Sequence, residues 1–413
     1  MSEAGGEAAE VRKRFLMVCM QFPTGPGESY MTTELADALV AAGHRVEVLF
    51  LNWAAPIGAE TREYWSPGGV RVVECAPAAV TGLGGMARAA SKFMLSGRHL
   101  AREARQRFDL ASFDAAIAWM PAIAIAPLVP LLARAGIRHR ILFIWDFFPD
   151  HHREIGRIPG GPAYWIARAW EQRLLRRFTA IVCTLPGNAA YLRRTYRIEP
   201  AQRVLVTPIW SDTTPRPAVD RASIRARHDL PGDRPIAIFG GQIVEGRGFE
   251  QMLGAADAAA AAGSPLLFLF IGDGRLAPMI RERAARQDNI RHLPGVSRAA
   301  YLELVGACDV GMVATVPGVT SFSIPTKTID YLRAGIPVIA AVEHGSDFIA
   351  MLTSYDVGVA VPFNEPGFFF REAERLATDP AVRARMAENA PRCLDEVFDV
   401  RHALATLLDA ARD

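Results

Sequence analysis

A lysine and an aspartate three residues apart mark the most chemically suggestive segment of the chain. The segment PTKTIDYLRAGIPVIA, residues 325–340, places Lys327 and Asp330 at the start of an expected short helix. This spacing puts both side chains on one helix face, and the free N–H groups of a first helical turn favour an anion. We therefore expect Lys327 to neutralise a diphosphate and Asp330 to accept hydrogen bonds from ribose hydroxyls. The plainer alternative is a solvated lysine beside a surface aspartate.

The scarcity of lysine favours the chemical interpretation. Of 46 cationic residues only Lys13, Lys92 and Lys327 are lysine, so arginine supplies almost every ordinary surface cation. A lysine beside an expected anion site therefore favours a chemical role more strongly here than it would in a lysine-rich chain.

Glycine clusters follow three of the expected strands. They comprise Gly25 and Gly27, then Gly240 and Gly241 with Gln242, then Gly272 and Gly274 around Asp273. Glycine lets a backbone approach a phosphate closely, although a tight strand-to-helix turn explains any single cluster equally well. Neither a Gly-x-Gly-x-x-Gly dinucleotide fingerprint nor a phosphate-binding loop ending in Gly-Lys-Ser/Thr is present in the sequence.

Short apolar runs that alternate with amphipathic stretches must position these residues. We expect strands at 15–20, 46–51, 70–75, 115–120, 141–145, 180–183 and 204–207, and again at 236–241, 266–272, 310–315 and 337–342. Alternating β and α segments predict parallel sheets covered by helices on both faces. The fold class is therefore α/β, with two doubly wound domains joined near residues 208–220. Ligands are expected in the cleft between the strand ends.

The charge distribution separates the two halves. Residues 1–212 carry a net charge of +6 and residues 213–413 a net charge of −4. This asymmetry fits an anionic partner for the first half, and it fits a chance distribution of solvated charge equally well. Within it, residues 86–107 hold six cations and one acid among several apolar side chains, a composition suited to an anionic bilayer and equally to a solvated helix. The basic residues are otherwise dispersed and aromatic interleaving is sparse, so nucleic-acid binding is disfavoured.

Two further features bear on location. The five cysteines are odd in number, widely spaced and mostly embedded in apolar runs, which favours free thiols in a reducing compartment and hence the cytoplasm. Residues 115–133 lack charge, but prolines interrupt them and alanine dominates, so we expect a buried strand that continues into a helix rather than a membrane span. No spacing of His, Cys, Asp or Glu suggests a metal site.

Taken together, these segments resemble the retaining glycosyltransferases of family 4, and within them the capsule and exopolysaccharide subgroup. The subgroup motif Pro-Ser-Lys-x-x-Glu-Tyr-Leu-x-x-Gly-x-Pro-Val-Ile-Ala stands here as residues 325–340, and further resemblance lies in residues 34–49, 145–150, 270–276 and 289–313. The resemblance implies the GT-B fold, with two Rossmann-like domains facing across a cleft. On this basis residues 12–212 would bind the acceptor, residues 213–395 the nucleotide sugar, and residues 396–413 would form a helix that crosses back to the first domain.

The resemblance also implies roles for individual residues. Lys327 would contact the diphosphate and Asp330 the ribose, where the family generally has glutamate. The family's phosphate-binding cations fall on Gln242 and Arg247, so one of the two is kept, and the glutamate that contacts the donor sugar falls on Phe322. Asp146, or else His151, would orient the acceptor hydroxyl or accept its proton. The remaining residues expected at the donor are Gly240, Gly241, Gly272, Asp273, Gly274, Val296, Ser321, Ser323 and Thr326, with Gly25, Gly27 and Phe322 at the substrates.

The expected activity is transfer of a sugar from a nucleotide diphosphate sugar, with retention of configuration, to a glycan, lipid-linked or small-molecule acceptor. Neither a metal nor a cofactor beyond the donor is expected, and the enzyme would be cytoplasmic, with peripheral contact at the inner membrane face through residues 86–107. Three alternatives remain, of which a membrane scaffold is the weakest. A non-catalytic nucleotide-sugar-binding partner is suggested by Phe322 and Gln242, and a GT-B nucleotide-sugar epimerase would share the fold.

Overall fold

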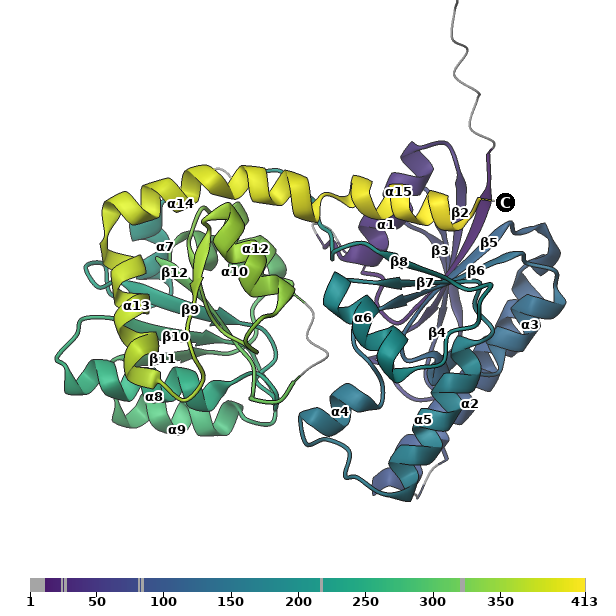
Figure 1. Ribbon diagram of the computed structural model, residues 1–413, viewed down its shortest axis with the longest axis horizontal. Helices are drawn as coiled ribbons and strands as arrows, with labels where there is room; N and C mark the ends of the chain where they lie inside the picture. The colour runs from purple at the N-terminus through teal and green to yellow at the C-terminus, as the bar shows by residue number, and fades with distance from the viewer. Residues whose placement is uncertain are drawn as a thin grey trace, which may run out of the picture.

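Two sheets covered by helices make up the protein (Figure 1). The computed structural model describes residues 12–23, 25, 28–80, 82, 85–215, 218–319 and 324–412. In this part of the chain the first sheet has the strand order β3-β4-β2-β1-β5-β6-β7-β8. Its strands are β1 (Arg14–Cys19), β2 (Arg45–Leu51), β3 (Arg62–Trp65), β4 (Arg71–Cys75), β5 (Ala115–Trp119), β6 (His139–Ile144), β7 (Ala180–Cys183) and β8 (Arg203–Val206).

The second sheet lies in the C-terminal half and has the order β11-β10-β9-β12-β13-β14. Its strands are β9 (Ile236–Gly240), β10 (Leu267–Ile271), β11 (Ile290–Leu293), β12 (Val310–Ala314), β13 (Val338–Ala341) and β14 (Gly358–Ala360). All of its pairings are parallel. Strands β9, β10 and β12 are buried along their whole length because helices cover both faces, which explains their uninterrupted apolar sequences. The α/β class expected from the sequence is confirmed.

The first sheet departs from the expected all-parallel arrangement at one edge. Strand β3 pairs antiparallel with β4, through a register that sets Arg62 opposite Glu74. A tight turn joins the two strands, with the backbone N–H of Ser66 donating to the carbonyl of Val70, and so short a connection permits only antiparallel pairing. The sequence REYW of β3 escaped prediction because this edge strand is largely exposed and half charged.

Helices fill the space around both sheets. The first domain holds α1 (Met31–Ala41), α2 (Gly85–Arg107), α3 (Leu128–Arg134), α4 (Asp150–Glu154), α5 (Pro162–Leu175) and α6 (Pro186–Thr195), with a short 3₁₀ turn η2 (Ala122–Ile125). The second holds α7 (Arg221–Arg227), α8 (Phe249–Ala261), α9 (Ala277–Arg286), α10 (Arg298–Gly306), α11 (Lys327–Arg333), α12 (Asp347–Tyr355), α13 (Pro366–Thr378) and α14 (Pro380–Cys393). Strand β5 leads through η2 into α3, as expected for residues 115–133. None of the described helices is both long and apolar enough to cross a bilayer.

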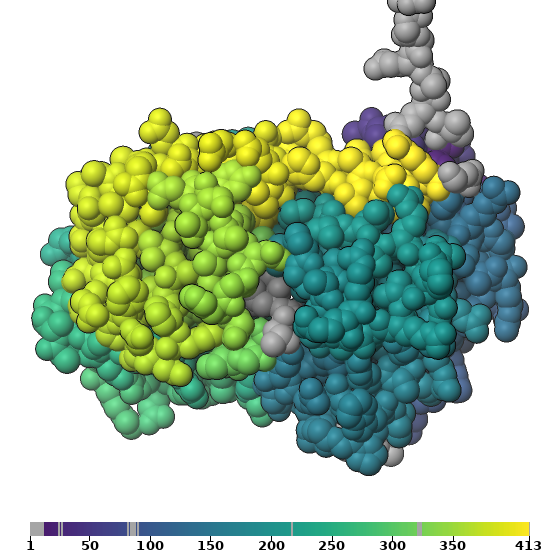
Figure 2. Space-filling model, in the orientation of Figure 1, coloured from purple at the N-terminus to yellow at the C-terminus, as the bar shows by residue number. Residues whose placement is uncertain are grey.

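The chain finally returns to the first domain. After α14 a π-helical turn, η3 (Leu394–Phe398), leads into α15 (Val400–Ala410), which packs against α1 and β8. Figures 1 and 2 show this yellow segment lying across both domains. Leu407 of α15 is fully buried there, and Arg203 at the start of β8 forms an ion pair with Asp409.

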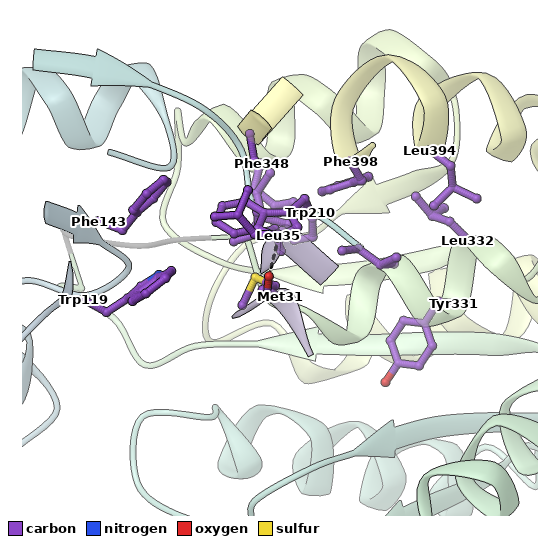
Figure 3. Close-up of a cluster of buried hydrophobic side chains, with 14 of the residues drawn as sticks. Met31, Leu35, Trp119, Phe143, Trp210, Tyr331, Leu332, Phe348, Leu394 and Phe398 are labelled. Carbon is purple, nitrogen blue, oxygen red and sulfur yellow. Dashed lines mark hydrogen bonds between the residues drawn. The ribbon is translucent and has the colours of Figure 1, made fainter. Parts of the chain in front are cut away.

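One apolar cluster connects the two domains (Figure 3). Trp210, from the segment between the domains, is buried in it and donates its indole N–H to the carbonyl of Met31 at 2.7 Å. Phe348 of α12 and Phe398 of η3 belong to the same cluster. Beside it the backbone N–H of Ser211 donates to the carbonyl of Phe398. The domains are therefore joined by a packed core and not by a bare linker.

The strand order fixes where a ligand can bind. In the first sheet the order reverses between β1 and β5, and in the second between β9 and β12. Ligands of open parallel sheets bind outside the carboxyl ends of the strands at such points. Gln21 follows β1, Gln242 follows β9, and both line one cavity between the domains.

Candidate active site

Two adjoining cavities occupy the space between the facing strand ends. The larger cavity, of about 790 Å³, is lined mainly by the second domain. The smaller cavity, of about 360 Å³, lies between the α4 region of the first domain and the loop after β9. The residues that line both are Tyr30, Gln242, Arg247, Pro325 and Thr326. These shared walls make the two cavities parts of one cleft, with the predicted cation Arg247 at their junction.

Lys327 lies on the wall of the larger cavity, at the first residue of α11. Its Nζ lies 3.3 Å from the centroid of the Phe239 ring, near the end of β9, and faces Gly241. A cation against an aromatic face is attracted electrostatically by the quadrupole of the ring. Burial lowers the pKa of Lys327 well below its ordinary value, and the positive charge of Arg247 lowers it further, while Asp330 opposes the shift. The negative charge of Asp330 is thus too small to offset the cost of burying a protonated lysine beside Arg247.

Arg247 is brought close to Lys327 by the loop between β9 and α8. Gly248 ends this loop with φ +60°, and a Cβ there would lie 2.7 Å from the carbonyl oxygen of Thr315. Glycine is therefore required for the loop to pack against β12. The Arg247 side chain is exposed in the cleft, as is that of Gln242. Two cations from distant parts of the sequence converge on one wall, which suits a doubly charged anion.

Asp330 also lines the larger cavity, but it has a partner that the sequence did not suggest. Arg298, at the start of α10, donates to both carboxylate oxygens of Asp330, at 2.7 and 2.6 Å. Asp330 is only 5% exposed, so this bidentate pair fixes its orientation. Each carboxylate oxygen keeps a second lone pair for a hydroxyl group of a ligand. Arg298 and Tyr301 of the same helix are cavity residues that sequence reasoning missed.

The glycines of this region serve mainly to pack loops closely. A Cβ on Gly240 would lie 2.1 Å from the Tyr301 ring, and one on Gly272 would lie 1.9 Å from the carbonyl oxygen of Gly241. Gly274 has φ +150° and packs against the backbone of Ile243. It does not line the larger cavity. Among the described glycines of this region, Gly241, with φ +129°, is the one where an added Cβ would point towards Lys327. Its missing side chain leaves space beside the lysine.

The other predicted donor residues have varied surroundings. Asp273 lines the larger cavity and accepts a hydrogen bond from the backbone N–H of Gly295 at 2.8 Å, next to Val296 on the same wall. Thr326 precedes Lys327 and lines both cavities. Gly25 closes a turn with Glu28 and is absent from the walls of either cavity. Gly27, Ser321, Phe322 and Ser323 lie outside the described residues.

The smaller cavity contains the residues predicted to act on an acceptor. Asp146 is exposed on its wall, beside Trp145, and His151 and His152 line it from α4. Burial and the neighbouring His151 lower the pKa of His152, whereas Asp146 raises it. His152 is therefore mostly neutral at neutral pH. Burial and the charge of Asp146 also raise the pKa of Tyr30, which keeps its hydroxyl protonated between the two cavities.

A buried carboxylate holds this wall in place. Asp150, the first residue of α4, accepts hydrogen bonds from the hydroxyls of Tyr164, Tyr191 and Tyr196, and Arg168 donates to it at 2.9 Å. Two of these donors belong to α5, one belongs to α6, and Tyr196 directly follows α6. Because Asp150 directly precedes the two histidines, the four donors fix the start of α4. Of the two acids in WDFFPD, Asp150 is structural and Asp146 is free to face the cleft.

Comparison with known proteins agrees with this geometry. Residues 27–210 match the family described as "Glycosyl transferase 4-like domain", and residues 220–392 match "Glycosyl transferases group 1". The chain belongs to the family-4 glycosyltransferases. The two matches together include the whole second sheet, every strand of the first sheet except β1, and every residue that lines the two cavities except Gln21.

Individual relatives of this glycosyltransferase are distant. A protein of Escherichia coli (strain K12) named as a colanic acid biosynthesis glycosyl transferase, WcaI, is 25% identical over 258 residues, which cover 60% of this chain and 62% of the relative. WbjE of Pseudomonas aeruginosa, named as a glycosyltransferase, is 24% identical over 57% of this chain and 59% of its own. The chain thus spans about three fifths of the length of these curated relatives.

Solved structures resemble the glycosyltransferase over almost its whole length. The sucrose-phosphate synthase of Thermosynechococcus elongatus superposes with a TM-score of 0.68 at 16% identity, covering 96% of this chain and 98% of that one. Anabaena Alr3699/HepE, solved in complex with UDP, superposes at 0.67 with 14% identity, over 96% and 98% of the two chains. At these identities the likeness shows the fold alone, and that fold is GT-B.

Proposed function

We propose that this glycosyltransferase transfers a sugar from a nucleotide diphosphate sugar to an acceptor hydroxyl, with retention of anomeric configuration. The observation that carries the proposal is that Lys327 and Arg247 share a wall of the larger cavity, with Arg247 also lining the smaller one. A diphosphate placed there would lie between a cavity large enough for a nucleoside and a second cavity lined by Asp146 and His151. HepE, a protein of the same fold, has been solved with UDP, which supports a nucleoside diphosphate as the ligand class.

The chemistry proposed for this arrangement is stabilisation of the leaving group. As the bond between the anomeric carbon and the diphosphate oxygen breaks, negative charge grows on the departing phosphate. Lys327 and Arg247 would stabilise this charge, since cations held in place before the reaction need little reorganisation when charge develops. They supply the positive charge that a divalent metal provides in other transferases, so we propose that the reaction is metal-independent.

The acceptor would bind in the smaller cavity. Asp146 is the exposed carboxylate on its wall, and it would accept or orient the proton of the attacking hydroxyl. His151 is the second candidate for this role, and the low pKa of the adjacent His152 leaves that imidazole able to accept a hydrogen bond. Retention rests on the family resemblance, and it would require the hydroxyl to attack from the face that the diphosphate leaves.

We also propose that the enzyme contacts a membrane peripherally and acts in the cytoplasm on a surface polysaccharide or glycolipid. The six cations of residues 86–107 support an electrostatic contact with anionic lipids. The similarity to WcaI, named for colanic acid biosynthesis, supports a polysaccharide product.

The donor site can be tested by thermal shift with UDP-, GDP-, ADP- and dTDP-sugars. Ligand that binds only the native state raises the melting temperature. We expect one nucleotide class to stabilise the wild type and to have little effect on Lys327→Ala. Lys92→Ala is the matched control, because Lys92 lies on α2 against the Trp53 ring and lines neither cavity, so this variant should respond like the wild type.

The reaction itself needs a second measurement. NMR of the product formed from an α-linked donor, in buffer containing EDTA, should show an α-linked product. An inverted product or a strict metal requirement would contradict the proposed mechanism. Binding of a donor without transfer to any acceptor would instead favour a non-catalytic binding protein.

A further inference from the structure

Helix α5 displays large apolar side chains to solvent. Trp165 and Ile166 are each 61% exposed, and Trp170 is 41% exposed. Ile166 and Trp170 are four residues apart and so lie on one face of the helix, with Trp165 at its border. We call these three residues the α5 apolar face. Single exposed apolar residues are common on protein surfaces, but two tryptophans and an isoleucine within six residues are a patch that water disfavours.

Positive charge surrounds this face. Residues 151–177 contain six arginines and two acids, and one of the acids, Glu171 of α5, is fully buried. Arg153, Arg173 and Arg177 are exposed around the helix. Tryptophan beside arginine is the composition of surfaces that sit at the boundary between lipid headgroups and acyl chains.

Helix α2 adds charge to the same side of the molecule. Both α2 and α5 pack against η2, and Figure 1 shows them together on the side of the first domain away from α15. The sequence suggested that α2 itself presents apolar side chains to a membrane, but Phe93 is half-buried and packs against the Trp53 ring, at a centroid distance of 5.3 Å. Among the described side chains of α2, Met94 is the large hydrophobic residue that remains exposed.

We propose that the α5 apolar face docks on an anionic lipid bilayer, with α5 inserting its tryptophans at the interface and α2 contributing electrostatic attraction. The loop that leads into α5 carries Ile155 and Arg157, which line the smaller cavity. The bilayer would therefore lie beside that cavity. On the proposed transferase function, an acceptor anchored in the membrane then reaches Asp146 without leaving the lipid.

Vesicle flotation tests the docking surface directly. Wild-type protein is mixed with vesicles of phosphatidylcholine alone, or of phosphatidylcholine and phosphatidylglycerol in equal parts, and compared with a triple variant carrying Trp165→Ser, Ile166→Ser and Trp170→Ser. Trp65→Ser is the matched control, because Trp65 is 70% exposed but lies on the edge strand β3. We expect wild type and control to float with the anionic vesicles. Partitioning should weaken on the order of tenfold for each α5 side chain removed, as expected for buried side chains of this size.

Two results would overturn the proposal. One is flotation of the triple variant equal to that of the wild type. The other is self-association of the wild type, measured by light scattering without lipid, that the triple variant abolishes, because the face would then be an interface between copies of the chain. The thermal shift with nucleotide sugars is measured on the same variants, so a failure of the transferase proposal can be told apart from a failure of membrane docking.

Discussion

Binding of a nucleoside diphosphate should be coupled to the uptake of a proton by Lys327. In the free protein, burial and the charge of Arg247 hold the pKa of Lys327 well below its ordinary value. A bound diphosphate would place negative charge near Nζ and return this pKa towards its normal range. At any pH between the two values the lysine is mostly neutral when free and mostly protonated when bound, so binding takes up one proton and tightens as the pH falls.

The size of the effect follows from this linkage. One proton taken up corresponds to a tenfold increase in Kd for each pH unit gained, or about 1.4 kcal/mol of binding free energy. Above about pH 7 the terminal phosphate, with a second pKa of about 6, is already ionised and does not contribute. Isothermal titration calorimetry with the stabilising nucleoside diphosphate, in two buffers of different ionisation enthalpy, measures the proton uptake directly.

Lys327→Arg is the control that isolates the titration from the charge. Arginine keeps the positive charge but does not deprotonate in this range, so this variant should bind with a flat pH profile and no proton uptake. The reasoning would be refuted if the wild type bound without proton uptake across the neutral and alkaline range, or if Lys327→Arg kept the wild-type slope.

Three other outcomes follow from the packing. Gly240→Ala should lower the free energy of unfolding in urea by about 1–3 kcal/mol, because the new Cβ would overlap the Tyr301 ring. Adding Tyr301→Ala should recover part of the loss, and simple addition of the two losses would argue against this contact. Burial raises the pKa of Glu171 from 4.5 to about 8. The native state therefore binds this proton more tightly than the unfolded chain, and the resulting stability is present below pH 4.5 and is lost as the pH rises to about 8. Glu171→Gln should flatten the melting temperature over that range, and a wild-type slope would contradict the assignment. Asp347→Ala removes the acceptor of a 2.7 Å hydrogen bond from Gly187 across the domains. We expect a stability change within about 1.5 kcal/mol and an unchanged radius of gyration in small-angle scattering, because the buried cluster around Trp210 still joins the domains; a larger radius would contradict this.

Most buried strands were predictable because a strand covered on both faces must be apolar throughout. β5 and β10 have such sequences, whereas β14 is only three residues long and β11 carries Arg291 and His292, so neither stood out. Both were missed for the same reason as β3, since a short or exposed strand need not be apolar.

The candidate site was predictable only in part. Lys327 and Arg247 could be singled out by residue type and by family resemblance, and the structure places both on one cavity wall. The pairing of Arg298 with Asp330 joins two helices 32 residues apart in sequence, and no local pattern specifies it. The exposure of Trp165 was not predicted either, because an aromatic residue in a helix is ordinarily assigned to the core.

The position of α15 constrains the order in which the protein can form during synthesis. Its buried residues Leu407 and Ala410 belong to the same apolar cluster as Leu35 and Leu39 of α1. The first domain to leave the ribosome consequently lacks one of its covering helices until α15 has been translated. The second domain, in contrast, is continuous in sequence and can complete its own sheet earlier. The N-terminal half must therefore wait with part of α1 uncovered, and a chain truncated before α15 would leave that surface exposed to aggregation.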